Sequence, residues 1–404
     1  MKFDFTMVPD RHGKDALALD GLGRRRGFAP EAPEEGFDAI PMWIADMNFA
    51  TAPSILSALE DRLKHPLFGY FEPSEEYYQA IIRWQETRHG VHDLKKEYIG
   101  YENGVLGGVV SALNIMCSRG DPVLVHSPTY IGFTNVLNNN GYHIVHSPLT
   151  RDAQGVWRMD YEDMERRIRE NRIHAAILCS PHNPCGRVWE RWELEKAYEV
   201  YRRYDVQVVS DEIWSDILLS GRRHIPSQTV SEDAAMRTVA LYAPSKTFNL
   251  AGLIGSYHIV RNEKLRSRME KESSLCHYND MNVLSMHALI GAYQEEGAAW
   301  ADELCQVLTE NVRYAVDYIR THFEGVSVFE PEGTYMLFLD CEQWCRKHNC
   351  SLEELEKKGW RVGVAWQDGS MFNDPYAIRV NLALPLSRVK EAMERLSRYV
   401  FCET

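Results

Sequence analysis

Short apolar runs alternate with amphipathic segments between residue 54 and about residue 260 of the chain. The amphipathic segments repeat apolar residues every three or four positions, which is the period of a helix that buries one face. Alternation of this kind favours βαβ units that build a parallel sheet. The predicted strands are 122–126, 174–180, 206–210 and 237–243, and predicted helices between them include 160–169 and 191–204.

The pattern changes after residue 285. A helical period over 285–322, interrupted only by glycines, leads to strand-like runs at 334–339, 361–365 and 377–382, and then to a closing helix capped by Ser387. We therefore predict an α/β fold: a large domain with a mostly parallel sheet flanked by helices, and a smaller α+β domain built from both chain termini. The predicted ranges are 51–288 for the large domain, 289–404 for the small one, and 1–50 for an N-terminal arm that joins the small domain.

Composition narrows the class of protein. The 404 residues are 45% hydrophobic and 25% charged, which is typical of a globular protein with ample core. A formal net charge of −13 argues against a nucleic acid or an anionic membrane as partner. No apolar run reaches the roughly 18 residues of a membrane helix, and the first ten residues lack the apolar core of a secretory signal. The expected location is cytoplasmic.

The nine cysteines suit free thiols in a reducing compartment. One cluster, Cys341, Cys345, His348 and Cys350, could suggest zinc. Its spacings are not those of paired zinc knuckles, and the segment also reads as a helix that turns Cys341 and Cys345 inward. We expect no metal.

Polar residues follow four predicted strands in turn. Tyr130 comes after the first, Asn183 after the second, Asp211 after the third and Lys246 after the fourth. Ligands of an open parallel sheet bind outside the carboxyl ends of its strands. Lys246 alone reads as a solvated loop lysine, but four such strand ends together indicate a site.

The chemical types of these side chains complement one another. A buried carboxylate such as Asp211 needs a cation, and a protonated pyridine nitrogen is one. Asn183 can donate to a phenolate oxygen, Tyr130 can stack on a ring, and Lys246 can form an imine with an aldehyde. This set fits pyridoxal 5′-phosphate.

Two further features fit the same cofactor and its substrate. A glycine-rich turn at 102–108 opens an apolar helix, where backbone N–H groups favour a phosphate, although this signal alone is weak. Arg379 lies within an apolar strand of the small domain. It either pairs with an internal acid or binds a carboxylate in a bidentate way.

These residues occur in longer motifs that resemble a known family. The motifs are Pro41-Met-Trp-Ile-Ala-Asp-Met-Asn48, His65-Pro-Leu-Phe-Gly-Tyr70, Ser127-Pro-Thr-Tyr130, Ser180-Pro-His-Asn-Pro-Cys-Gly186, Ser210-Asp-Glu-Ile213 and Ala243-Pro-Ser-Lys-Thr-Phe-Asn-Leu-Ala-Gly252. Nearly end to end, the chain resembles the fold-type I pyridoxal-phosphate enzymes of the class I/II aminotransferase superfamily. It is most similar to their MalY/PatB branch of cystathionine β-lyases, also called cysteine-S-conjugate β-lyases.

The resemblance implies a role for each matched position. Lys246 would bind the cofactor covalently and act in catalysis, Arg379 and Trp43 would bind the substrate, and Tyr70 would reach the phosphate in the partner subunit of a homodimer with shared active sites. The remaining cofactor contacts implied are Gly104, Val105, Leu106, Tyr130, Asn183, Asp211, Trp214 and Ser245. The implied reaction is cleavage of cystathionine or a related cysteine S-conjugate to a thiol, pyruvate and ammonia.

Two positions depart from the family pattern. Ala243 stands where superfamily members often carry serine, which leaves more of the phosphate to Ser245 and Tyr70. Trp214 stands where a tyrosine or histidine is usual, which weakens the case for an acid–base group there. The alternatives are an aminotransferase with the same residues and a cofactor-binding regulator without catalysis. The presence of both Lys246 and Arg379 argues against the regulator.

Overall fold

The computed structural model describes residues 1–24, 28–275 and 279–402. The chain folds into two compact units. Unit 1 comprises Met1–Ala50, Pro184–Gly186 and Glu303–Thr404, and unit 2 comprises Thr51–Asn183 and Arg187–Asp302.

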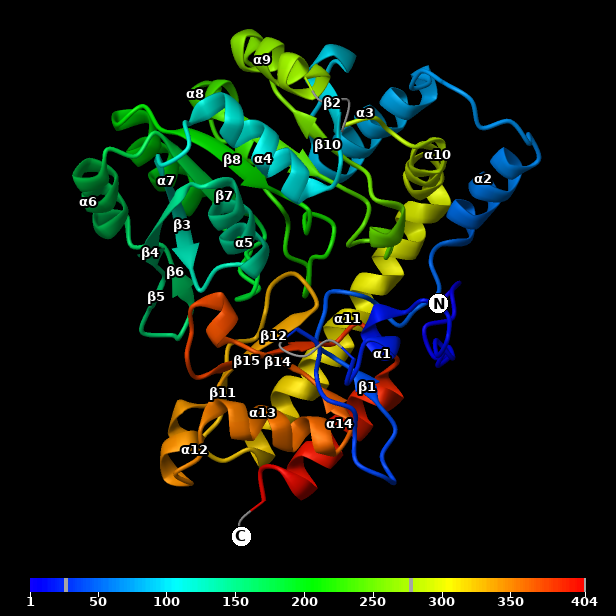
Figure 1. Cartoon of the computed structure of the whole chain (residues 1–404), viewed down its shortest axis with the longest axis vertical. Coiled ribbons are helices and arrows are strands. Elements are labelled where there is room, and N and C mark those ends of the chain that lie inside the picture. Colours follow the sequence, from blue (N-terminus) through cyan, green and yellow to red (C-terminus); the bar gives the residue numbers. More distant parts are fainter. Residues whose placement is uncertain (25–27, 276–278, 403–404) are drawn as a thin grey trace. The chain divides into compact units, whose positions relative to one another are not determined.

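Unit 2 is built on a seven-stranded sheet with the order β2-β10-β9-β8-β7-β3-β4 (Figure 1). β10 runs antiparallel to both of its neighbours, and the five strands from β9 to β4 are parallel. Every residue of β7 and β9 is buried, as expected for strands covered on both faces. The strands are β2 (Ile99–Glu102), β3 (Pro122–Ser127), β4 (His143–Pro148), β7 (Ala175–Cys179), β8 (Gln207–Asp211), β9 (Thr238–Tyr242) and β10 (Ser256–Ile259); β5 (Thr150–Arg151) and β6 (Trp157–Arg158) form a separate hairpin.

Helices cover both faces of this sheet. α4, α5 and α9 share one hydrophobic cluster with the strands, and α7 approaches the sheet through Tyr198, whose hydroxyl lies 2.9 Å from Thr238 Oγ1. The predicted α/β class is confirmed. The helices are α2 (Pro53–Leu63), α3 (Glu75–His89), α4 (Val105–Met116), α5 (Ile131–Asn140), α6 (Tyr161–Asn171), α7 (Arg191–Arg203), α8 (Glu232–Arg237), α9 (Glu263–Ser274) and α10 (Val283–Ala292).

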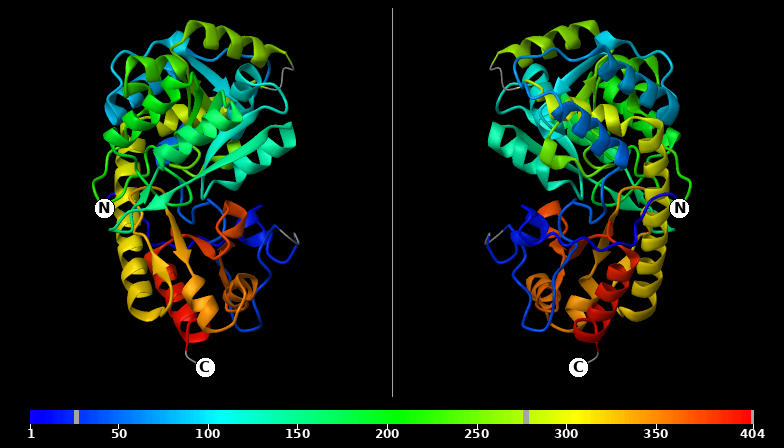
Figure 2. Two further views of the ribbon diagram at one scale, coloured as in Figure 1. Left: turned by 90° about the vertical axis from the view of Figure 1, so that its left-hand side faces the viewer. Right: turned by 90° about the vertical axis from the view of Figure 1, so that its right-hand side faces the viewer.

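Unit 1 combines both ends of the chain. Its four-stranded antiparallel sheet has the order β11-β12-β15-β14, and β1 of the N-terminal arm pairs in parallel with β13. The strands are β1 (Ile40–Pro41), β11 (Ser327–Val328), β12 (Met336–Asp340), β13 (Val364–Ala365), β14 (Gln367–Asp368) and β15 (Ala377–Asn381). The helices are α1 (Leu17–Asp20), α12 (Glu342–Lys347), α13 (Leu352–Arg361) and α14 (Leu386–Tyr399), together with part of α11 (Glu295–His322), the long yellow helix of Figure 2.

Three expected elements differ in the structure. The helix predicted over 285–322 breaks between α10 and α11, where a Cβ on Gly297 would lie 1.9 Å from the Ala292 carbonyl oxygen. The strand predicted from residue 361 begins at Val364 instead, because α13 extends through Arg361 and Gly363 turns the chain with a φ of 83°. Ser387 lies inside α14 rather than capping it, since Pro385 precedes the first helical residue.

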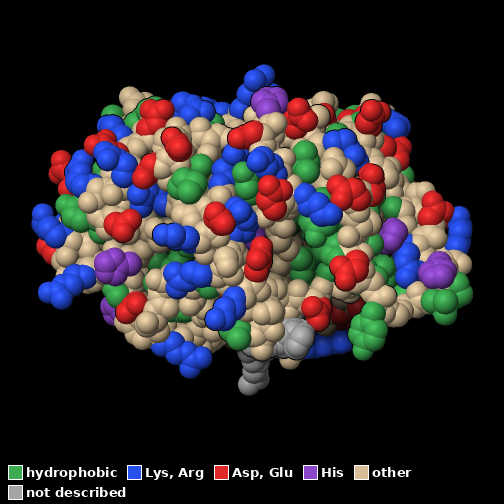
Figure 3. Space-filling model, turned by 90° about the horizontal axis from the view of Figure 1, so that it is seen from above, with side chains coloured by type: hydrophobic (Ala, Val, Ile, Leu, Met, Phe, Trp, Pro, Cys, Tyr) green, Lys and Arg blue, Asp and Glu red, His purple; other side chains and the backbone are tan. Residues whose placement is uncertain are grey.

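The face seen in Figure 3 carries charges of both signs. On the face in Figure 3, basic and acidic side chains intermingle, and neither sign gathers into a patch. None of the helices in the described residues is long and apolar enough to cross a membrane.

Candidate active site

The carboxyl ends of the parallel strands are tied together at one edge of the unit 2 sheet. Asp211 lies opposite Cys179 and Leu241 in the register. The backbone N–H of Ser180 donates to the Asp211 carbonyl oxygen at 2.9 Å. These contacts bring the segments that carry Asn183, Asp211 and Lys246 to the same edge.

Asp211 is a buried carboxyl group at this edge, with only 3% of the residue exposed. Burial raises its pKa to about 7, while the Ile213 N–H, 3.1 Å away, and the charge of Lys246 act in the opposite direction. Lys246 Nζ lies 5.9 Å from the ring centroid of the buried Trp214. The site therefore holds a carboxyl group whose ionised form requires a nearby cation.

The turn before α4 leaves the first N–H groups of the helix without a side-chain cap. Gly104 is its N-cap residue, with a φ of 76°, and no side chain caps the helix. The first N–H groups of α4, beginning with those of Val105 and Leu106, have no partner within the helix and favour an anion. In the described part of the chain, the Ser245 hydroxyl makes no hydrogen bond, so it remains available as a further donor.

Tyr130 is held against this turn by a close contact that only glycine permits. A Cβ on Gly132 would lie 2.3 Å from Tyr130 Cε1 and 2.9 Å from Leu106 Cδ1. Tyr130 also meets Phe133 edge-on, with ring centroids 5.4 Å apart. Gly132 therefore fixes the ring that was predicted to stack on a cofactor.

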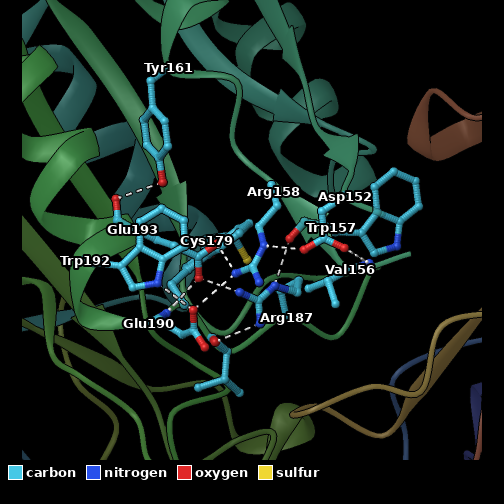
Figure 4. A network of polar contacts seen from close by, with 12 residues as sticks. Asp152, Val156, Trp157, Arg158, Tyr161, Cys179, Arg187, Glu190, Trp192 and Glu193 are labelled. Carbon is cyan, nitrogen blue, oxygen red and sulfur yellow. Dashed lines mark hydrogen bonds and ion pairs between the residues drawn. The ribbon is translucent and has the colours of Figure 1, made fainter. Parts of the chain in front are cut away.

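The loop that carries Asn183 is braced by a buried ion pair (Figure 4). Asn183 is 3% exposed, and the preceding His182 donates its backbone N–H to the Arg187 carbonyl oxygen at 2.8 Å. The Arg187 guanidinium pairs with Glu193 and donates to the Trp157 carbonyl oxygen at 2.9 Å. Because this loop is anchored behind Asn183, its amide is held in position.

Sequence reasoning assigned no role to a buried polar network behind the site. Glu212, fully buried, lies 2.5 Å from His224 Nε2 and accepts a hydrogen bond from the Tyr242 hydroxyl at 2.7 Å. Burial alone would raise the pKa of Glu212, but His224 and the hydrogen bonds hold it below its usual value. An acid directly after Asp211, in an otherwise apolar run, was the available sequence signal.

A second buried acid, Asp216, reaches the residue next to the lysine. Its Oδ2 accepts from the Thr247 hydroxyl at 3.3 Å and from Trp84 Nε1 at 3.2 Å. His89 Nε2 lies 3.3 Å from Asp216 Oδ1. The backbone on both sides of the site, at 212 and at 247, is thus fixed by buried hydrogen bonds.

Arg379 and Trp43, the predicted substrate-binding residues, lie together in unit 1. Arg379 is 3% exposed, and its Nη2 donates to the Trp43 carbonyl oxygen at 3.1 Å and to Gln367 Oε1 at 2.5 Å. Its guanidinium lies 4.5 Å from the Phe372 ring centroid. These two hydrogen bonds orient the guanidinium.

Two other predictions concern Tyr70 and the cysteine cluster. Tyr70 is fully exposed, in the segment between α2 and α3, and contacts none of the cofactor-binding positions. Cys341 precedes the first residue of α12, Cys345 lies within this helix, and both are buried. Nowhere in the described ranges do three or more His, Cys, Asp or Glu side chains gather as a metal site.

The chain is similar to known proteins along its whole length. A family model for aminotransferases of class I and II matches residues 39–396. The cystathionine beta-lyase PatB of Bacillus subtilis (strain 168) is 33% identical over 396 residues, which cover 97% of this chain and 98% of PatB. Protein MalY of Escherichia coli (strain K12) is 31% identical over 404 residues, which cover 98% of each chain.

The chain is also similar to solved structures over nearly its whole length. Cystalysin from Treponema denticola, which contains pyridoxal 5′-phosphate, superposes with a TM-score of 0.90 at 28% identity and covers 99% of both chains. The pyridoxal-phosphate-bound C–S lyase from Staphylococcus hominis superposes with a TM-score of 0.88 at 27% identity, over 99% of this chain and 98% of that one.

Proposed function

Because the chain belongs to the class I and II aminotransferase family and its cofactor is pyridoxal 5′-phosphate, we propose that it is a carbon–sulfur β-lyase. Its substrates are cystathionine or related cysteine S-conjugates. One water molecule is consumed, and the products are a thiol, pyruvate and ammonia. The observation that carries this proposal is the convergence of Lys246 and the buried Asp211 at one sheet edge, in a chain similar end to end to C–S lyases.

The residues of unit 2 fit the cofactor. Asp211, whose pKa burial raises to about 7, suits a position opposite a cationic ring nitrogen, where it holds the proton on that nitrogen. The uncapped start of α4 and the Ser245 hydroxyl would hold the phosphate, with Gly104 allowing close approach of the backbone. Asn183 would donate to the ring oxygen, and Tyr130 and Trp214 would pack against the ring.

Lys246 and Arg379 act on the substrate. When bound, the cofactor supplies an electron sink for the pair left on the α-carbon. Lys246 binds the cofactor in the resting enzyme and then takes the α-proton at Nζ. Arg379 binds the substrate carboxylate through its guanidinium.

We also propose that the protein works as a homodimer in which Tyr70 completes the phosphate site of the partner subunit. The support is an exposed apolar segment between α2 and α3. Leu67 is 67% exposed, Phe68 58% and Tyr70 fully. Arg62 braces this segment by donating to the carbonyl oxygens of His65 and Leu67, each at 2.8 Å. Exposed apolar side chains held in one conformation favour association with a second copy.

The test of the proposed reaction is an assay with cystathionine and no 2-oxo acid, scored for both pyruvate and thiol. Equal release of the two products is expected. Lys246→Ala should abolish it, because the base and the covalent anchor are lost, whereas Lys264→Ala, at an exposed position on α9, should not. A rate that requires added 2-oxoglutarate would instead assign the protein as an aminotransferase.

A further inference from the structure

A cavity of about 760 Å³ lies within unit 1, beside the contacts that hold Arg379. Phe28, which is 49% exposed, and the half-buried Trp360 line it, and the Phe28 ring meets the buried Trp43 edge-on at 5.5 Å. This volume is typical of small-molecule sites. Aromatic walls suit an apolar group, and their ring faces attract a cation.

The ionisable side chains around the cavity are predominantly acidic. Among the described residues, Glu31, Glu353, Glu356 and Asp368 line it, against a single lysine, Lys357. That lysine already lies 2.6 Å from Glu353. Among these lining side chains acids predominate, which favours a cationic group close to them.

Glu356 is the acid that points most clearly to a ligand. It is 93% buried, since only 7% of it is exposed, and its Oε1 accepts the Asp368 N–H at 2.7 Å. Its other carboxylate oxygen has no hydrogen-bond partner in the described part of the chain. Burial, with Asp368 nearby, raises the pKa of Glu356 to about 8, as expected for a carboxyl group that lacks a counter-charge.

Gln367 joins this cavity to Arg379. It is 8% exposed, lines the cavity, and accepts from Arg379 with its Oε1. Its amide N–H groups make no hydrogen bond to any described residue. Trp43, another lining residue, makes a second link, since its carbonyl oxygen accepts from Arg379. Gln367 and Trp43 therefore connect the wall of the cavity to Arg379.

We propose that the cavity binds the group beyond the sulfur atom of the substrate and selects cysteine conjugates in which that group is an aromatic body carrying a positive charge. The aromatic body contacts Phe28 and Trp360, and the cation lies at Glu356. This inference rests on the proposed function in one respect, which is that Arg379 binds the substrate carboxylate.

A matched set of three conjugates tests it: S-(4-aminomethylbenzyl)-, S-(4-methylbenzyl)- and S-(4-carboxybenzyl)-cysteine, which differ mainly in charge. With the holoenzyme at pH 8.5, kcat/KM for pyruvate release should fall in that order. The cation should exceed the neutral conjugate by about tenfold or more, given a Coulombic contact and a cation–π contact. Equal values, or a preference for the carboxylate, would overturn the proposal.

Binding without turnover separates this proposal from the proposed reaction. Calorimetric titration of the cofactor-loaded Lys246→Ala variant with the same three compounds should give the same order of Kd values. Absence of pyruvate from every conjugate and from cystathionine, with this order of Kd values intact, would reject the lyase and keep the cavity. Pyruvate release without discrimination among the three conjugates would keep the lyase and reject the cavity proposal.

Substitutions of single acids show which side chain causes the preference for the cationic conjugate. Glu356→Gln retains an acceptor for the Asp368 N–H, so the fold is preserved, and the ratio of cationic to neutral kcat/KM should fall by about tenfold. Glu342→Gln, on α12 away from the cavity, should leave the ratio unchanged. If Glu356→Gln lowers the yield of folded protein, Glu31→Gln, at an exposed position, provides the second measurement and should lower the ratio about twofold. If neither Glu356→Gln nor Glu31→Gln changes the ratio of cationic to neutral kcat/KM, the cavity is not the site that selects the cation.

Discussion

Glu212 and His224 form a fully buried hydrogen bond, with Glu212 Oε2 2.5 Å from His224 Nε2. The same carboxylate accepts the Ser227 N–H at 3.0 Å and the Ser210 hydroxyl at 2.9 Å through its other oxygen. Because Glu212 follows Asp211 directly, this network fixes the backbone that presents Asp211. The pair therefore couples the stability of unit 2 to the geometry of the site.

Glu212→Gln should lower the free energy of unfolding by about 3 kcal/mol, because it leaves buried donors and His224 with a neutral, poorly matched partner. The pKa of Glu212 is held below its usual value, so its contribution is present at neutral pH and lost as the pH falls through the folded-state pKa. The variant should therefore lose less stability on acidification than the wild type. Urea unfolding at several pH values measures both effects.

The matched control is Glu170→Gln. Glu170 and Arg166 form an exposed pair on α6, 3.4 Å apart. The free energy of unfolding should therefore change by no more than about 0.5 kcal/mol. Equal losses in the two variants would contradict a structural role for the buried network.

Asp211 should make the cofactor-free protein less stable as the pH rises. Its pKa is about 7 in the fold, above the value of the unfolded chain, so the folded protein binds the proton more tightly. The stabilisation from this tighter proton binding is complete below about pH 4 and is lost as the pH rises through 7. The free energy of unfolding should therefore fall by about 2.5 kcal/mol between pH 5 and pH 8. Asp211→Asn should remove this part of the slope in urea unfolding.

Cofactor loading provides the control for the same experiment. A cationic ring nitrogen beside Asp211 lowers its pKa, so the wild-type holoenzyme should show a smaller slope between pH 5 and pH 8 than the cofactor-free protein. An unchanged slope in both Asp211→Asn and the holoenzyme would place the responsible group elsewhere.

The sequence predicted the strand ends well, because four apolar runs, each followed by a polar residue, specify both the sheet and its ligand-binding edge. For that reason it proposed Asp211 and Lys246 as site residues, and the predicted family, fold class and cofactor are confirmed. It could not pair Asp216 with His89 or Glu212 with His224, since those contacts depend on how segments far apart in the chain pack. The cavity beside Arg379 was missed for the same reason: its acids come from the N-terminal arm, from α13 and from β14, which are far apart in the chain.

Gly132→Ala should weaken cofactor binding. The added Cβ would lie 2.3 Å from the Tyr130 ring and 2.9 Å from Leu106, so both side chains must shift. Overpacking of this kind costs about 1–3 kcal/mol, which we expect as an increase of about tenfold or more in the cofactor Kd. Gly252→Ala, where a Cβ would meet no atom within 4 Å, should leave the Kd unchanged. Cofactor titration followed by absorbance compares the two, and equal Kd values would separate Gly132 from the site.

Phe68→Asp should convert the proposed dimer to monomers. Phe68 is 58% exposed in the segment between α2 and α3, where Arg62 contacts its ring at 5.0 Å. A carboxylate there would have to be desolvated on association, which costs several kcal/mol. Sedimentation velocity should show the monomer over micromolar concentrations, and the cofactor Kd should rise because Tyr70 of the partner subunit is removed from the phosphate. Met236→Asp, at a 44% exposed position on α8, should keep the dimer. A Phe68→Asp protein that sediments as the wild type does would reject this segment as the interface.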